Sequence, residues 1–395
     1  MQNIDNKVKI EKIDAKSFRV PIANPVITSF GAMTSRPAVF VRIEDSDGAF
    51  GWGEIFANWP AAGAEHRVRL TIEDVSDLIF TRTFARPSSL FEDLTRQTHI
   101  RALQCGEWGP FSHVIAGLDI AFNDLLSRRA GLPLARFLNS KAPLIVPTYA
   151  SGIHIREADR VVGECRAQGY DAFKVKVGFD LVDDIERLKE IAGSLGASER
   201  LFSDANQGWD ADTAITFLAE LEGQPIGWLE EPIPADAPAN DWQRVARASS
   251  IPLAGGENIS GDIDFSSAIA SGAFGVIQPD VAKWGGVTKC REVAVQATAQ
   301  GRLYCPHFLG GGIGLATSAA VLASVQGDGL LEVDSNANPL REAFNLWRTG
   351  EARNQFRIND QPGLGVVDLP EEIAQYETLS ASATRSGQFT VTARA

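Results

Sequence analysis

Three acidic residues end three consecutive short apolar runs in the middle of the chain: Asp204 after LFS, Glu230 after WL, and Glu257 after PLAGG. Between these runs lie amphipathic stretches long enough for one helix each, which predicts a parallel sheet built from strand–helix units. In a parallel (β/α) barrel all strands end at one face, so the three carboxylates should converge there. Converging carboxylates need a cation, and a set of oxygen ligands is typical of Mg²⁺, with Mn²⁺ as a possible substitute.

The same pattern continues on both sides of the acidic residues. Lys174 and Lys176 end the preceding run, and Asp280, His307 and Glu332 follow the next three runs. A single acidic residue at a strand end often only caps a helix or faces water. One polar or charged residue in each of several successive units is instead what a barrel active site requires.

The strand order indicates how these side chains are arranged. With strands counted from residue 144, the three carboxylates form one wall, with Lys176 on one flank and His307 on the other. Lys174 and Lys176 point to the same side of their strand, about 6.6 Å apart along it. Their like charges and partial burial should lower the lysine pKa, as an amine base requires. Asp280 should fix the tautomer of His307. This layout suits removal of a proton next to a substrate carboxylate.

The elements that hold these residues divide the chain into three parts. Residues 1–140 should form a separate α+β layer, residues 141–361 the barrel, and residues 362–395 a segment that packs back on the first part. In the first part we expect strands at 8–20, 38–44 and 49–54, loops at 22–36 and 56–65, and helices at 67–79, 90–101 and 112–129. The barrel strands should lie near 144–149, 171–177, 200–205, 226–230, 251–256, 275–280, 302–306 and 329–333.

Composition excludes several classes of protein. The chain has 395 residues, 22% of them charged, and a net charge of −13, which argues against a nucleic-acid partner. No run approaches the roughly 18 apolar residues of a membrane span. The four cysteines lack CxxC spacing and should be reduced thiols. We therefore expect a cytoplasmic enzyme with a small-molecule carboxylate substrate and no membrane partner.

The motifs also resemble a known family. FKVKVG, SDANQGWD, WLEEPIP, GGEN, QPDVAKWGG, PHF and LLEVD match, in this order, the mandelate racemase subgroup of the enolase superfamily. The resemblance implies an α/β fold in which an α+β capping domain, built from both termini, covers a modified (β/α)7β TIM barrel. It further implies one Mg²⁺ per site, a homo-oligomer, and removal of the α-proton of a carboxylate through a metal-stabilised enediolate.

The resemblance also implies a role for each site residue. Asp204, Glu230 and Glu257 would bind the metal, and Lys176 and His307 would be the opposing bases. The remaining roles are as follows: Lys174 would steady the substrate carboxylate, Asp280 would pair with His307, Glu332 would hydrogen-bond the enediolate, and Asn206 would touch the substrate. Trp59, in the loop at 56–65, and Tyr149, on the first barrel strand, are further candidates for substrate contact.

These residues reduce the number of possible reaction types but do not identify a single one. Asp280 occupies the sixth-strand position where the muconate-lactonizing and dipeptide-epimerase branches carry a lysine, so we set those branches aside. GGGIG at 310–314 is not GxGxxG, because Leu315 replaces the third glycine, and it should shape the active-site loop. PHFLGGGIG and EVDSNANPLRE resemble sugar-acid dehydratases and lactone cycloisomerases, which makes this reaction type our first prediction.

Several alternatives stay open. The same lysine and histidine could racemise or epimerise a hydroxy or amino acid derivative. A metal-free Schiff-base aldolase could also place a lysine on a barrel strand, but it would not need three acidic ligands. A catalytically retired barrel with a binding role would have no reason to keep the whole set of residues.

Overall fold

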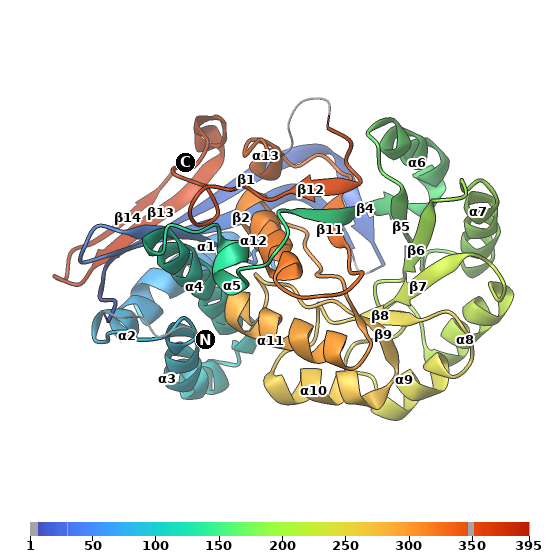
Figure 1. Cartoon of the computed structure of the whole chain (residues 1–395), viewed down its shortest axis with the longest axis horizontal. Coiled ribbons are helices and arrows are strands. Elements are labelled where there is room, and N and C mark those ends of the chain that lie inside the picture. The colour runs from blue at the N-terminus through green and yellow to red at the C-terminus, as the bar shows by residue number, and fades with distance from the viewer. Residues whose placement is uncertain (1–6, 30, 347–350, 395) are drawn as a thin grey trace.

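The computed structural model describes residues 7–29, 31–346 and 351–394. Two sheets organise them: a five-stranded antiparallel sheet and a curled sheet of eight parallel strands (Figure 1). In Figure 1 the helices α6 to α10 surround the outer side of the curled sheet, and the antiparallel sheet lies at the opposite end of the molecule. The chain is thus an α/β barrel with a second, α+β domain that caps it.

The parallel strands follow one another around the barrel in the order β10-β9-β8-β7-β6-β5-β4-β11. These strands are β4 (Ile145–His154), β5 (Ala172–Lys176), β6 (Arg200–Asp204), β7 (Ile226–Glu230), β8 (Leu253–Gly255), β9 (Phe274–Ile277), β10 (Leu303–Tyr304) and β11 (Leu331–Asp334). The helices between them are α6 (Ala158–Ala167), α7 (Leu181–Gly193), α8 (Ala211–Glu220), α9 (Ala239–Ala246), α10 (Asp262–Ser271), α11 (Gly286–Ala299) and α12 (Gly312–Ala323). Seven strand–helix units and a final strand confirm the expected (β/α)7β barrel, and each of the eight predicted strands overlaps an observed one.

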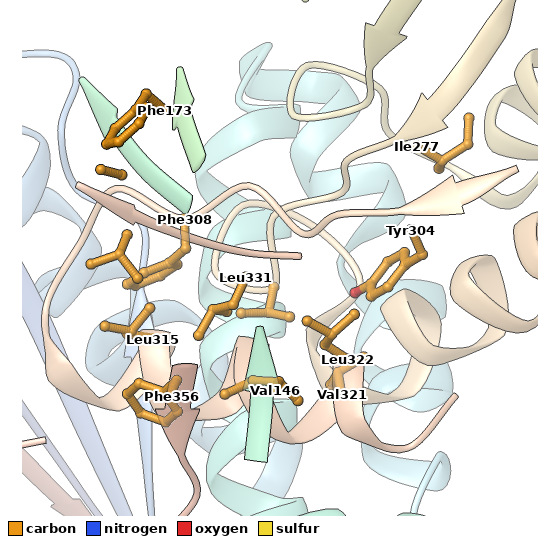
Figure 2. Close-up of a cluster of buried hydrophobic side chains, with 14 of the residues drawn as sticks. Val146, Phe173, Ile277, Tyr304, Phe308, Leu315, Val321, Leu322, Leu331 and Phe356 are labelled. Atoms are coloured by element: carbon orange, nitrogen blue, oxygen red, sulfur yellow. The ribbon is translucent and has the colours of Figure 1, made fainter. Parts of the chain in front are cut away.

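Buried apolar side chains fill both sides of the barrel wall. Between the wall and the helices, Val146 of β4 lies beside Phe356 of β12 (Gln355–Arg357), its antiparallel neighbour, and near Leu331 of β11 and Val321 of α12 (Figure 2). A second cluster fills the barrel interior: Tyr149, Ala172, Phe202, Trp228, Ala254, Val276, Cys305 and Leu330. Parallel strands covered on both faces explain why these segments are continuous apolar runs.

The antiparallel sheet joins the two ends of the chain, in the order β14-β13-β1-β2-β3. Its strands are β1 (Ile10–Thr28), β2 (Gly31–Asp45), β3 (Phe50–Ile55), β13 (Glu377–Thr384) and β14 (Phe389–Ala393). Figure 1 shows the red C-terminal strands beside the blue N-terminal ones. The helices of the same region are α1 (Gly63–Arg69), a π-helical turn (Leu70–Val75), α2 (Ser76–Phe80), α3 (Ser89–Cys105), α4 (Trp108–Arg129) and α5 (Leu134–Leu138), and α13 (Pro339–Glu342) follows the last barrel strand.

The expected loop at 22–36 is wrong. Apart from Phe30, which lies outside the described residues, and Ser29, this stretch belongs to the long hairpin of β1 and β2. Its proline, glycine and small polar residues suggested a loop, but Pro25 lies where the strand pairing is interrupted, between Pro21 and Val26. A bulge tolerates a residue without a backbone N–H, so the strand continues beyond it.

Helix α4 joins the capping domain to the barrel. It packs against β3 on one side and α11 on the other. Its buried Asp119 accepts hydrogen bonds from the backbone N–H of Thr288, at 2.9 Å, and from the Thr288 hydroxyl, at 2.6 Å. A carboxylate at a helix N-terminus satisfies amides that the helix leaves unpaired. Elsewhere in the same interface, Arg36 of β2 pairs with Asp334 of β11 at 2.6 Å. In the part of the chain that the structure describes, no helix has the length and apolarity needed to span a membrane.

The Asp119 carboxyl should make stability depend on pH. Burial, opposed by the Thr288 hydrogen bonds, raises its pKa from 3.8 to about 7. The folded chain then holds a proton that the unfolded chain has lost, so this contribution to stability disappears as the pH rises from about 4 to about 7. The free energy of unfolding of wild type and of Asp119→Asn can be measured with urea at pH 5 and at pH 8. The value for wild type minus the value for the variant should be about 1–3 kcal/mol larger at pH 5 than at pH 8. Equal differences at the two pH values would show that Asp119 does not titrate in this range.

Candidate active site

The three carboxylates predicted to converge do lie at neighbouring strand ends. Asp204 ends β6 and Glu230 ends β7, where the two residues are register partners. Glu257 follows β8 by two residues. Asp204 and Glu230 are 0% and 1% exposed, so their charges cannot be screened by bulk water. Partners inside the protein must neutralise them.

Each of the three carboxylates has a different cationic group as its closest partner. Lys176 Nζ lies 2.6 Å from Asp204 Oδ2, and Lys174 Nζ lies 2.7 Å from Glu230 Oε2. On the other side, His307 Nε2 lies 2.6 Å from Glu257 Oε2. Because each carboxylate turns toward its own cation, the described residues contain no group of three ligating side chains already gathered around one point. The donor set itself, three carboxylates on adjacent strand ends, fits a hard divalent cation.

Lys174 forms the floor of the site. Its side chain is 1% exposed, and its Nζ also lies 2.6 Å from Glu332 Oε1. Glu332 accepts further hydrogen bonds from the Ser151 hydroxyl at 2.5 Å and the Phe308 backbone N–H at 3.0 Å. Tyr149 lies lower still: it is 0% exposed, and Lys174 Nζ is 5.5 Å from its ring centroid. The structure therefore places Tyr149 beneath the floor, while the side chains of Lys176, Glu257 and His307 stay 10–13% exposed at the opening.

The ion pairs set the protonation of the site. Burial raises the pKa of Glu230 to about 7, and the neighbouring Asp204 carboxylate adds to this effect. Burial alone would lower the pKa of Lys176, but the Asp204 carboxylate outweighs it and the pKa is raised. The predicted lowering of the Lys176 pKa is therefore wrong for this arrangement, because an anion in direct contact outweighs the like charge of Lys174.

His307 has a partner on each ring nitrogen. Its Nδ1 lies 2.8 Å from Asp280 Oδ2, opposite the Nε2 contact with Glu257. Burial would lower the pKa of His307, but the Glu257 and Glu332 carboxylates raise it well above its usual value. Asp280 is held in turn by the backbone N–H groups of Ala282, at 2.8 Å, and Lys283, at 3.2 Å. The Asp280–His307 pair is thus present as predicted, with its aspartate fixed by its own turn.

The other two predicted site residues belong to the surroundings. Asn206 donates its backbone N–H to Asp204 Oδ1 at 2.8 Å and its side-chain amide to Oδ2 at 3.4 Å. From the β1–β2 hairpin, the Ser29 hydroxyl donates to the carbonyl of Asn206 at 2.6 Å. Trp59, in the segment after β3, is 38% exposed, and its ring lies close to Gly31 of the same hairpin. The capping domain therefore reaches the site region through both segments.

Several polar residues that hold the site together were not predicted from the sequence. Gln278 donates to Glu230 Oε2 at 2.7 Å, and Asn258 donates to both oxygens of Glu231 at 2.9 Å. Gln278 stands two positions before Asp280, so strand alternation could have indicated it. Ser151 was missed because the first barrel strand was predicted to end at residue 149, whereas β4 continues to His154. The most informative of the missed residues, Glu54, comes from the capping domain.

The α+β domain over a (β/α)7β barrel, with acidic residues at successive strand ends, is the fold of the enolase superfamily. Residues 12–139 match the mandelate racemase / muconate lactonizing enzyme N-terminal domain, and residues 156–372 match the enolase C-terminal domain-like family. The chain belongs to the mandelate racemase/muconate lactonizing enzyme family of this superfamily. It is accordingly an enzyme of the lyase or isomerase type.

Named relatives include enzymes of acid-sugar chemistry. The chain is 28% identical over 346 residues to D-galactarolactone cycloisomerase of Agrobacterium fabrum, covering 84% of this chain and 89% of the relative. It is 32% identical over 309 residues to 3,6-anhydro-alpha-L-galactonate cycloisomerase of Streptomyces coelicolor, covering 75% and 82%. It is 27% identical over 353 residues to D-galactonate dehydratase of Xanthomonas axonopodis pv. citri, covering 85% and 89%.

Solved structures show the same architecture. A mandelate racemase/muconate lactonizing enzyme from Bordetella bronchiseptica RB50 is 43% identical, with a TM-score of 0.85 over 92% of this chain and 98% of that one. A racemase from Streptomyces coelicolor A3(2), solved with bound magnesium, is 28% identical, with a TM-score of 0.81 over 93% and 100%.

Removal of Lys174 should be costly because it leaves two buried carboxylates without their cation. For Lys174→Met in metal-free buffer we expect the free energy of unfolding to fall by about 3–5 kcal/mol, measured by urea denaturation. The matched control is Lys189→Met, whose pair with Glu220 has 37% and 58% exposed side chains. It should cost about 1 kcal/mol or less. Similar losses in the two variants would mean that the floor of the site is not a stabilising ion pair.

Proposed function

We propose that this enzyme removes the α-proton of a sugar-acid carboxylate and that it is a dehydratase or a related cycloisomerase. The observation that carries the proposal is the arrangement of Lys176 and His307. One pairs with Asp204 and the other with Glu257, so they lie at opposite ends of the carboxylate wall. A substrate carboxylate bound at that wall would have its α-carbon between two proton-transfer groups.

Asp204, Glu230 and Glu257 would hold one Mg²⁺, with Mn²⁺ as a substitute. The magnesium-bound racemase of related fold supports this choice, as does the set of oxygen donors. When bound, the ion would neutralise the carboxylate wall and stabilise the negative charge of the enediolate. The ligand roles have a structural requirement: each carboxylate must turn from the cation that it faces in the described structure.

The other residues of the chain would act on protons and orientation. Lys176 accepts a proton only as the neutral amine, so the base requires that its pair with Asp204 be weakened first. Asp280 would hold Nδ1–H of His307 and leave Nε2 to move a proton at the opposite face of the substrate. Lys174 and Glu332, both on the floor, would lie under the substrate carboxylate, and Lys174 would donate to it. Glu332 would hydrogen-bond the enediolate only as the protonated acid, so its pair with Lys174, which lowers its pKa, must be weakened first. Asn206 and Trp59 would contact the rest of the substrate.

The substrate class rests on the relatives. Three relatives are similar to this chain over most of its length: a D-galactarolactone cycloisomerase, a 3,6-anhydro-alpha-L-galactonate cycloisomerase and a D-galactonate dehydratase. Polyhydroxylated acids and their lactones offer both an acidic α-proton and a β leaving group, which suits two opposed proton-transfer groups. Racemisation remains the second candidate, because the same pair of groups could return the proton to the other face and a structural relative is a racemase.

A panel of acid sugars and their lactones would test the proposal. In Mg²⁺ buffer, wild type should form a keto acid from an aldonate or aldarate, or open or isomerise a lactone, as followed by semicarbazide absorbance and by NMR. Glu230→Gln should bind Mg²⁺ more weakly and lose nearly all turnover. Full activity in excess chelator would contradict the ligand assignment, and a product of inverted configuration without elimination would instead identify a racemase.

Exchange of the α-proton in D₂O should separate the two bases. Lys176→Ala should lose exchange at one α-configuration, and His307→Asn at the other, by a factor of about 10²–10⁴ in rate. Asp280→Asn should give a partial form of the His307 defect, since the imidazole stays in place but its tautomer is no longer fixed. Equal loss at both configurations from either single variant, with metal bound and the fold intact, would contradict this layout.

A further inference from the structure

The chain segment at the end of β3, residues 54–58, connects the capping domain to two barrel loops. The Phe56 backbone N–H donates to the carbonyl of Ala282 at 3.2 Å, in the loop that carries Asp280. The Asn58 side-chain amide donates to the carbonyl of Leu309 at 2.9 Å, in the loop that carries His307. This 54–58 segment thus contacts the loops of both members of the Asp280–His307 pair.

Glu54 makes the strongest of these connections. Its carboxylate is 3% exposed and accepts the backbone N–H groups of Gly311, at 2.5 Å, and Gly314, at 2.8 Å. The two amides belong to the N-terminus of α12, which begins at Gly312. Burial raises the Glu54 pKa to about 7, and the like charge of Asp280 adds to this effect, while the hydrogen bonds from Gly314 and Gly311 oppose it. Helix amides and dipole are therefore what hold this carboxylate inside the interface.

The glycine-rich run at 310–314 is shaped around this carboxylate. A Cβ atom at Gly310 would lie 2.7 Å from Glu54 Oε1, and one at Gly311 would lie 2.9 Å from it. A Cβ at Gly314 would collide with the ring of Phe308, which Figure 2 shows next to Leu315 in the buried cluster. The glycines thus let the Glu54 carboxylate and the Phe308 ring pack directly against the start of α12.

The loop held in this way is short and carries site groups at its start. His307 lies four residues before Gly311, and the backbone N–H of the intervening Phe308 donates to Glu332. On the opposite flank, the capping domain contacts Asn206 through Ser29 of the β1–β2 hairpin. Among the hydrogen bonds of the described ranges, none joins the 54–58 segment to β5, which carries Lys176. The 54–58 segment therefore supports the loop that carries His307 and not the strand that carries Lys176.

We propose that Glu54 is a positioning residue for His307: its carboxylate, together with Asn58, fixes the 307–311 loop and so the imidazole. This role rests on the proposed function, in which His307 and Lys176 are the two proton-transfer groups. It adds that the capping domain supports the position of His307 and not that of Lys176. A displacement of a proton-transfer group by about 1 Å can cost up to about 10²-fold in rate. Loosening of this loop should therefore weaken the His307 side and spare the Lys176 side.

Glu54→Gln tests this inference with almost no change in side-chain volume. The amide can accept only one of the two N–H groups, and its own NH₂ faces the other. We expect α-proton exchange in D₂O at the configuration lost in His307→Asn to fall by about 10- to 100-fold, with exchange at the Lys176 configuration within about 3-fold of wild type. Asn58→Ala removes a less buried hydrogen bond to the same loop. It should also lower the exchange rate at the His307 configuration relative to that at the Lys176 configuration, by a smaller factor.

The matched control is Asp119→Asn. Asp119 is also a buried carboxylate of the capping domain at the N-terminus of a barrel helix, α11, and burial likewise raises its pKa to about 7. It should lower stability without changing the ratio between the two exchange rates. If Glu54→Gln lowers both rates equally, lowers neither, or behaves like Asp119→Asn, then Glu54 serves only stability and the inference is wrong.

A second readout does not depend on turnover. The chain has five histidines, so ¹⁵N-histidine spectra can resolve the Nδ1–H of His307 that faces Asp280. Solvent exchange of this proton should be at least about 10-fold faster in Glu54→Gln than in wild type or Asp119→Asn, since a loosened loop opens the bond to water. If no carboxylate in the panel exchanges its α-proton but this difference is present, the proposed function fails and the positioning role stands. If α-proton exchange occurs but the His307 Nδ1–H is equally protected from solvent in all three proteins, the proposed function stands and the positioning role of Glu54 is wrong.

Discussion

The neutralisation of buried carboxylates at one end of the barrel is the constraint on which the site depends. Asp204, Glu230 and Glu332 are each 0–1% exposed, and desolvated charges at such positions are unstable without partners. Lys174 meets this requirement on the floor by pairing with Glu230 and Glu332 together. Lys176 and His307 meet it at the two ends of the wall. The groups proposed to move protons are thus also the groups that balance charge in the described structure.

The two roles of Lys176 and His307, as partners of carboxylates and as proposed proton-transfer groups, conflict chemically. A lysine that neutralises an aspartate is a poor base, and a histidine between two carboxylates stays protonated. A divalent cation at the wall would take over the neutralising role and leave both side chains available for proton transfer. The raised pKa of Lys176 and of His307 are therefore properties of the arrangement in which the carboxylates face side chains. The proposed chemistry and the proposed metal depend on each other for this electrostatic reason.

The capping domain contributes to the same site from outside the barrel. It places carboxylates at the N-termini of two barrel helices, Asp119 at α11 and Glu54 at α12. Both are held by backbone amides, so they join the domains without adding an exposed ion pair that salt would weaken. Glu54 differs from Asp119 in its position, because the loop that it holds begins at His307. An interface that stabilises the fold can in this way also determine where a proton-transfer group lies.

The sequence by itself determined the barrel and its polar strand ends. Strands buried on both faces must be apolar throughout, so a charged residue that ends each run, such as Asp204 or Glu230, is visible without any structure. The alternation of these runs with amphipathic helices then requires the carboxyl ends to share a face. Where the sequence signal failed, at residues 22–36, proline and glycine indicated a loop, because a bulge in a long strand has the same local composition.

Only the tertiary structure decided which charges meet. The pairing of Lys176 with Asp204, and hence the direction of its pKa shift, depends on contacts between strands that are 28 residues apart in the chain. The contact of Glu54 with Gly311 spans 257 residues, and no local pattern predicts which domain supplies a partner to a helix N-terminus. Local periodicity encodes where a side chain stands on its own element. Electrostatic energies depend on distances between elements, and these are fixed only when the two domains pack together.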